Sequence, residues 1–236
     1  MAAMKLLYQT HSPYARKVLV AAHEMGLHRS LEVVHHETSP TRRNEEVFAL
    51  NPLGKVPVLI CDDGTVLFDS NVICEYLDGL HQGPLLIPSH PQLRYRALRM
   101  QALAQGIADA GITARWESER RPAELRWPVM HDGQIQKIAA ACDFVERGLA
   151  MQAREVGPTA RETDHVVAHR SGDVSVFSTN RHPDIGDIAL ATALSWIEFR
   201  RVYDFLTGRP CLAQWYSELC ARPSMRATTL EGQTHD

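Results

Sequence analysis

The hydrophobic pattern of the first eighty residues alternates between strand-like and helix-like segments. It predicts, in chain order, a strand at 4–8, a helix at 12–26, a strand at 31–36, a short polar helix or turn at 39–51, two strands joined by the turn Asp62-Asp63-Gly64, and a helix at 70–80. A crossover helix makes the first two strands parallel, whereas the tight turn makes the last two antiparallel. The expected order is therefore βαβ, a short helix, and ββα.

After residue 80 the strand patterns mostly disappear. Apolar residues instead recur at helical spacing over 92–112, 133–152, 184–202 and 210–223, with Pro223 closing the last helix. The segment at 184–202 is apolar on more than one side, which predicts a central helix. We expect an α/β domain at residues 1–80, a linker rich in glycine and proline at 81–91, and an all-helical domain at 92–236.

One stretch of the second domain, residues 153–183, is long, polar and weakly periodic. Apolar alternation on either side of Ser171-Gly172 predicts an inserted β-hairpin or a loop there. His165 and His169 are four residues apart, but nothing else in the sequence completes a metal-ligand set. We therefore expect no metal site.

Composition excludes several classes of function. The 236 residues are 44% hydrophobic and 22% charged with a formal net charge of −3, which is ordinary for a globular protein and gives no basic footprint for nucleic acid. No apolar run is long enough to cross a membrane, and the first residues lack a signal peptide. Five scattered cysteines without a CxxC motif favour reduced thiols. We expect a cytoplasmic protein.

Pro57 stands at the start of an apolar strand pattern, where a proline cannot donate to the ladder. A cis peptide bond before Pro57 would leave the backbone N–H and C=O of Val56 facing outward, free to pair with an extended peptide. An ordinary trans proline at a strand edge is the alternative, and this stretch alone does not decide between them.

Two further positions favour a small anionic or zwitterionic ligand. Ser12 precedes a helix whose N-terminal N–H groups and dipole attract an anion. Asp69 and Ser70 open a second helix, where the serine can bind a carboxylate and the aspartate an ammonium group. Ser12 as a simple helix cap, and Asp69-Ser70 as a capping pair, are the structural alternatives. Together with Val56, these positions suit a short zwitterionic peptide with a thiol in its middle.

The motifs "SPYARKV", "NPLGKVPVL" and "LFDSNVICEYL", in this order and followed by a helical domain, resemble those of the cytosolic glutathione transferases of bacterial type. The segment "DIGDIAL" also resembles the family's capping motif, with Asp184 as the N-cap and Asp187 at N3. The resemblance implies a thioredoxin-like first domain (βαβ-ββα), a helical-bundle second domain and a homodimer. Arg16, the fifth residue of the motif SPYARKV, is expected to pair within the first domain.

The resemblance also implies roles for particular residues. Ser12 matches the catalytic serine of the family. Glutathione, the co-substrate, is expected to be held by Lys55, Val56, Pro57, Asp69 and Ser70, although Lys55 could also be a solvated turn lysine. The wall of the second-substrate pocket is expected to include Tyr14, Ile112, Arg115 and Trp116, although Trp116 could equally belong to the core.

The implied activity is the addition of glutathione thiolate to a small electrophile, as in detoxification. A hydroxyl donor and helix amides would favour the thiolate, which is the nucleophile. Ser12 as a hydrolytic nucleophile with His11 as base is disfavoured, because adjacent residues rarely point together and no GxSxG motif is present. A glutathione-dependent isomerase or dehalogenase, and a non-catalytic protein for ligand carriage or protein interaction, are the alternatives.

Overall fold

The first half of the chain is built on a four-stranded mixed sheet. The computed structural model describes residues 4–155 and 182–232. The strands are β1 (Met4–Tyr8), β2 (Leu31–His35), β3 (Val58–Ile60) and β4 (Val66–Leu67), in the spatial order β2-β1-β3-β4. β1 pairs with β2 in parallel, whereas β3 is antiparallel to both β1 and β4. The predicted parallel and antiparallel pairings are confirmed.

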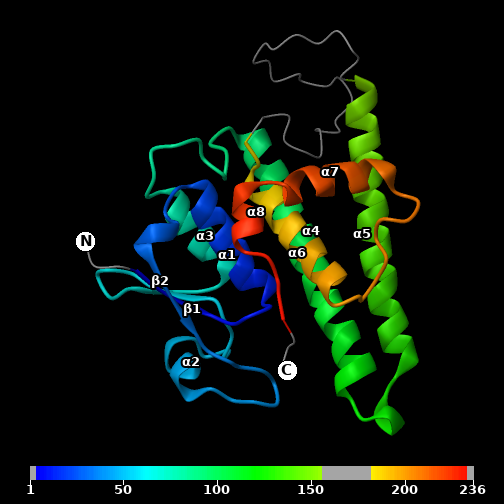
Figure 1. Cartoon of the computed structure of the whole chain (residues 1–236), viewed down its shortest axis with the longest axis horizontal. Helices are drawn as coiled ribbons and strands as arrows, with labels where there is room; N and C mark the ends of the chain where they lie inside the picture. Colours follow the sequence, from blue (N-terminus) through cyan, green and yellow to red (C-terminus); the bar gives the residue numbers. More distant parts are fainter. Residues whose placement is uncertain (1–3, 156–181, 233–236) are drawn as a thin grey trace.

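Helices cover both faces of this sheet. They are α1 (Pro13–Glu24), α2 (Glu45–Leu50) and α3 (Ser70–Asp78). Successive side chains of β1 point to opposite faces: Leu6 packs in the core beneath α1 and α3, and Leu7 packs with Val47 of α2. Figure 1 shows α1 and α3 on one side of the sheet and α2 on the other, with α1 next to the second half.

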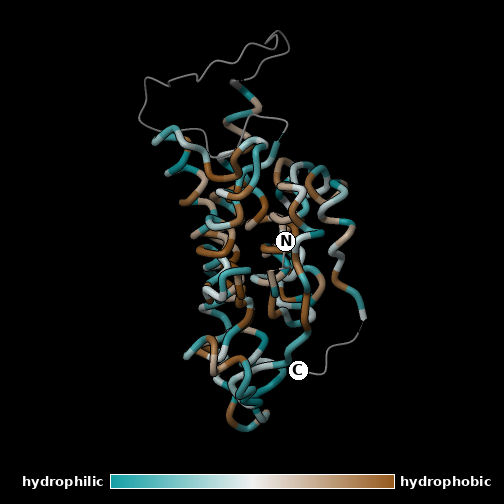
Figure 2. The backbone as a smooth tube through the Cα atoms, turned by 90° about the vertical axis from the view of Figure 1, so that its left-hand side faces the viewer, coloured by the Kyte–Doolittle hydropathy of each residue, from teal (hydrophilic) through white to brown (hydrophobic). Residues whose placement is uncertain are grey.

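The second half is helical throughout its described part. It contains α4 (Pro91–Arg115), a π-helical turn (Trp116–Arg120), a 3-10 turn (Ala123–Leu125), α5 (Pro128–Glu155), α6 (Ile185–Phe199), α7 (Pro210–Cys220) and α8 (Pro223–Ala227). α4 and α5 form a long antiparallel pair (Figure 1), and hydrophobic and hydrophilic turns alternate along the helices (Figure 2). The fold is therefore a small α/β domain followed by a helical domain.

The central position predicted for the segment at 184–202 is confirmed. Every residue of α6 from Ile185 to Ile197 is buried, and the helix packs against both α1 and α4. Glycine permits the close approach to α4: a Cβ on Gly186 would lie 2.6 Å from Cβ of Met100, and one on Gly111 would lie 2.3 Å from Ile197. These glycines bring α4 against α6 beside the first half.

Two element boundaries differ from the sequence predictions, and one predicted element is untested. The apolar strand pattern starts around Pro57, but the third strand begins only at Val58, because the turn at Pro57 does not join the ladder. Pro223 does not only close α7 but opens α8, as proline does readily at the first helical position. The predicted hairpin in 153–183 falls mainly on residues 156–181, which lie outside the described residues.

Candidate active site

The sheet brings the predicted glutathione-binding residues to one edge. Leu7 near the end of β1 pairs with Val58 at the start of β3, and Leu67 at the end of β4 pairs with Leu59. The chain leaves β1 toward Ser12, enters β3 from Val56, and leaves β4 toward Asp69 and Ser70 at this same edge. The topology thus gathers three segments that are far apart in sequence.

Ser12 is the N-cap of α1. Its Oγ accepts a hydrogen bond of 3.2 Å from the backbone N–H of Ala15, and its carbonyl receives the N–H of Arg16 at 3.0 Å. Because the hydroxyl uses its oxygen as acceptor, its own proton is available for another acceptor. The cap and the anion-donor roles of Ser12 are therefore compatible, and the side chain is half-buried at the helix N-terminus.

His11 is turned toward the second half of the chain. Its backbone adopts φ +67°, its ring lies on the ring of Phe199 with centroids 4.8 Å apart, and Nε2 pairs with the carbonyl oxygen of Glu231. Figure 1 shows the C-terminal segment running down beside α1. This arrangement engages the imidazole with α6 and the C-terminal segment, which speaks against a His11–Ser12 hydrolytic pair.

The peptide bond between Val56 and Pro57 is cis. Polar side chains hold the preceding loop from both sides: buried Asn51 donates through Nδ2 to the carbonyl of Lys55 at 2.8 Å, and Thr38 donates to the carbonyl of Gly54 at 2.8 Å. Val56 itself lies outside β3 and is buried, while Lys55 is exposed. The main chain at Val56 is thus fixed in position at the sheet edge without belonging to the ladder.

Asp69 and Ser70 form the start of α3. Oδ1 of Asp69 accepts the backbone N–H of Asn71 at 2.9 Å. Asp69 therefore caps α3, which is the structural role that the sequence analysis gave as an alternative to ligand binding. Ser70 is buried, and among the described residues its Oγ has no hydrogen-bond partner. A buried hydroxyl without a partner is costly, and a ligand carboxylate would satisfy it.

The four residues expected to line a second-substrate pocket occupy α1, the end of α4 and the start of the π-helical turn. The hydroxyl of Tyr14 donates to the carboxylate of Asp109 on α4, and burial together with this carboxylate raises the pKa of Tyr14. Ile112 follows Asp109 by three residues and shares its face of α4, whereas Trp116 is the first residue of the π-helical turn that follows α4. Arg115 pairs with Glu119 at 3.2 Å and has a mostly buried side chain.

Four polar residues near this edge were missed by the sequence analysis: Lys17 on α1, Asn71 on α3, and Gln105 and Asp109 on α4. Lys17 is 4% exposed, and its Nζ donates to Oδ1 of Asn71 at 2.6 Å. Gln105 accepts from Nδ2 of Asn71 at 2.9 Å. Lys17 belongs to the quoted motif SPYARKV and Asn71 follows Ser70 directly, whereas no sequence signal points to a position in the middle of a long helix.

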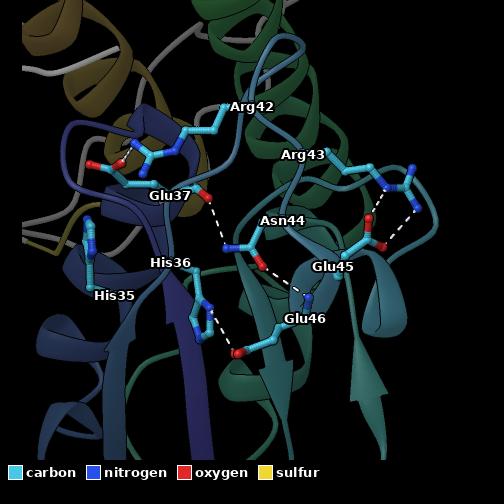
Figure 3. A pocket seen from close by; sticks show the side chains of 8 residues that line it. All are labelled: His35, His36, Glu37, Arg42, Arg43, Asn44, Glu45 and Glu46. Atoms are coloured by element: carbon cyan, nitrogen blue, oxygen red, sulfur yellow. Dashed lines mark hydrogen bonds and ion pairs between the residues drawn. The ribbon is translucent and has the colours of Figure 1, made fainter.

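A separate depression of about 650 Å³ lies over the end of β2 and the loop to α2. Its lining is polar and charged: His35, His36, Glu37, Arg42, Arg43, Asn44, Glu45 and Glu46. Figure 3 shows Arg42 turned to Glu37 and Arg43 turned to Glu45, so these charges are paired with one another. None of the predicted site residues lines this depression.

Within residues 4–155 and 182–232, no group of three or more His, Cys, Asp or Glu side chains is arranged to hold a metal ion. In the same ranges, no helix combines the length and the apolar character that a membrane crossing requires.

A mixed sheet with a helical domain behind it, and a cis proline, a serine and an Asp-Ser pair at one edge of the sheet, define the class of glutathione transferases. Comparison with protein-family models agrees: "Glutathione S-transferase, N-terminal domain" matches residues 11–80, and "Glutathione S-transferase, C-terminal domain" matches residues 103–218. These matches take in both halves of the chain, which belongs to the glutathione S-transferase family.

Relatives and solved structures extend over nearly the whole chain. The uncharacterized GST-like protein YibF of Escherichia coli K12 is 30% identical over 226 residues, covering 95% of this chain and 98% of YibF. A glutathione transferase family member from Pseudomonas fluorescens Pf-5, solved with bound glutathione, has a TM-score of 0.81 at 35% identity and covers 98% of this chain and 100% of its own. A glutathione S-transferase from Methylobacillus flagellatus with glutathione bound has a TM-score of 0.76 at 31% identity, and the match covers 97% of this chain and 100% of that one.

Proposed function

We propose that this glutathione S-transferase binds glutathione at the sheet edge and adds its thiolate to a small electrophile. The observation that carries the proposal is the convergence of Ser12, the main chain of Val56 and the Asp69-Ser70 pair at one edge. Val56 would pair with the backbone of the cysteinyl residue, and Ser70 would receive the γ-glutamyl carboxylate. Lys55, exposed on the neighbouring loop, would reach the glycine carboxylate. Solved relatives with glutathione bound support this choice of ligand.

In this mechanism Ser12 acts as a hydrogen-bond donor. A free thiol has a pKa of about 8.5, so only a few per cent is thiolate at neutral pH. Lowering that pKa by about 2 units requires a stabilisation of about 2.7 kcal/mol, which one hydroxyl and the N-terminal amides of α1 can provide. The sulfur then forms a bond to the electrophilic carbon, the leaving group departs with its electron pair, and the thiol proton goes to solvent.

The test compares the wild type with Ser12→Ala on glutathione and a chromogenic chloronitrobenzene. We expect kcat to fall about tenfold to hundredfold, corresponding to about 1.4–2.7 kcal/mol, while glutathione affinity changes little. Ser12→Thr keeps a hydroxyl and should recover part of the rate. Ser217→Ala, an exposed position on α7, is the matched control.

Unchanged kcat in Ser12→Ala would remove the catalytic role of the serine but leave the family assignment intact. Binding of glutathione without turnover of any electrophile would favour ligand carriage instead.

We also propose a homodimer. Exposed Val72 on α3 and Tyr95 on α4 flank an ion pair of 2.7 Å between Glu75 and Arg94, which gives a mixed apolar and charged surface suited to a two-fold contact. Gel filtration with light scattering should give twice the chain mass of 26.5 kDa. A monomer in that measurement would contradict the proposal.

A further inference from the structure

Lys17 is a buried lysine that the mechanism above does not use. It lies on α1, one turn after the serine cap, and is 4% exposed. Burial lowers the pKa of Lys17, while the negative charges of Asp69 and Asp109 act against this lowering. Its hydrogen-bond partner is a neutral group, the amide oxygen of Asn71 at 2.6 Å. Burying an ammonium group beside a neutral amide is expensive, which calls for a reason.

The donor character of Lys17 fixes the orientation of two amides in series. An ammonium group only donates, so the atom of Asn71 that faces it must be the oxygen. Nδ2 of Asn71 then points away and donates to Oε1 of Gln105 at 2.9 Å. Because Gln105 accepts through its oxygen, its Nε2 is the atom left to face Asp69. The donors along this relay all point from Lys17 toward the carboxylate.

The relay ends on the carboxylate oxygen that the helix cap leaves open. Oδ1 of Asp69 accepts the backbone N–H of Asn71 at 2.9 Å, and Oδ2 lies 3.5 Å from both Nδ2 of Asn71 and Nε2 of Gln105. Two long contacts orient Oδ2 without saturating it, so it can still accept a shorter bond from a cationic ligand group. Gln105 belongs to α4, so both halves of the chain shape this site.

We propose that Lys17 is a positioning residue for the ammonium group of glutathione: through Asn71 and Gln105 it orients Asp69, which receives that group. The inference rests on the proposed function, because it assigns a ligand group to the same edge. Lys17 does not touch the ligand; it sets which atoms of the two amides face the carboxylate. Its loss should weaken recognition of the ammonium group and leave the chemistry at the sulfur nearly unchanged.

A purely structural lysine would give a different outcome. Lys17 also borders a small cavity between α1, α4 and α6, so its removal could simply loosen the packing of the two halves. Asn71→Asp separates these explanations. An aspartate keeps the shape and gives Lys17 an ion-pair partner, but it has no N–H group to donate to Gln105. The packing role of Lys17 survives in this variant, whereas the relay is broken.

The experiment measures the dissociation constants of glutathione and of its analogue lacking the γ-glutamyl amino group, by titration calorimetry. Charge-assisted hydrogen bonds of this kind are expected to make wild type prefer glutathione about tenfold to hundredfold. We expect this preference to fall at least about fivefold in Lys17→Met and in Asn71→Asp. The KM for glutathione should rise while kcat stays within about twofold, since the sulfur site is untouched.

Lys137→Met, which removes an exposed lysine on α5, is the matched control and should keep the wild-type preference. Thermal melting checks that each variant is folded, and Gln105→Leu replaces Lys17→Met if the latter does not fold. Folded variants with the wild-type preference overturn the inference. Equal dissociation constants of the wild type for glutathione and for the analogue also overturn the inference, although this outcome leaves the proposed function standing. A wild type that binds neither compound overturns both.

Discussion

Gly54 sets the backbone of the loop that delivers Lys55 and Val56 to the site. Its φ of +61° disfavours residues with a Cβ, and an added Cβ would lie 2.1 Å from the ring of Phe48. We expect Gly54→Ala to lower the free energy of unfolding by about 2–4 kcal/mol, the sum of backbone strain and overpacking. Urea denaturation measures this loss, and a raised KM for glutathione should accompany it because the loop shifts.

Gly64 provides the control for that prediction. It also has a positive φ, +85°, but open space surrounds the position of its missing Cβ. Gly64→Ala should therefore cost only the backbone strain, about 1–2 kcal/mol, with glutathione binding intact. Equal losses in the two variants would show that contact with Phe48 does not matter.

At the residue scale, the sequence identified side chains whose role is local and missed those whose role depends on a distant partner. Ser12 before Pro13 predicts a helix cap, and the structure has Ser12 at that cap. Lys17 reads as a solvated helical lysine, because the contact with Asn71 spans 54 positions in sequence. The role of Gln105 is equally hidden in the sequence, because its partner Asn71 is 34 positions away. Helical spacing assigns a face to a residue but does not name the neighbour across it.

At the element scale, α6 begins at a capping box, as the motif predicts. Asp184 accepts the backbone N–H groups of Gly186 and Asp187, and the carboxylate of Asp187 accepts the N–H of Asp184 at 3.0 Å. Arg96 of α4 pairs with Asp184 at 2.8 Å. Burial, together with the negative charge of Asp184, raises the pKa of Asp187 to about 8. The helix start is therefore sensitive to pH.

This raised pKa predicts how stability depends on pH. Folded protein holds the Asp187 proton up to about pH 8, whereas unfolded chain releases it near pH 4. The contribution of this group is thus complete below about pH 4 and is lost as pH rises toward 8. In Asp187→Asn, which keeps an acceptor for the N–H of Asp184, the melting temperature should fall less between pH 5 and pH 8. Parallel melting curves for the two proteins would contradict the raised pKa.

The pattern of apolar residues predicted which segments are helices and which are strands, but it did not predict every local conformation. Residues 116–120 form a π-helical turn after α4, and nothing in their sequence, Trp-Glu-Ser-Glu-Arg, predicts this conformation. Contacts with the following connection hold this turn: Glu117 is buried and accepts from the backbone N–H of Trp127 and from Arg121. The sequence shows that residue 117 is a glutamate. It does not show that the partners of this glutamate lie in the connection between α4 and α5.

At the scale of the whole molecule, Arg16 ties the two halves together. Pairing within the first domain was expected, but the guanidinium donates to the carbonyl of Met225 at 3.1 Å, to the hydroxyl of Thr228 at 3.3 Å and to Ser195 of α6. All three partners belong to the second half, and Arg16 is 5% exposed. An arginine of the first half thus supplies the donor for polar groups of the second half.

This contact predicts that the two halves unfold together. The tryptophans all lie in the helical half (Trp116, Trp127, Trp196 and Trp215), so their fluorescence reports on that half. Cys74 is fully buried in the first half, and its labelling by a thiol reagent reports on that one. In urea the two signals should share one midpoint. Arg16→Met should lower the free energy of unfolding by about 2–4 kcal/mol in both signals, since two buried acceptors and one half-buried acceptor lose their donor. If Cys74 becomes reactive while tryptophan fluorescence stays native, the halves are independent and Arg16 does not couple them.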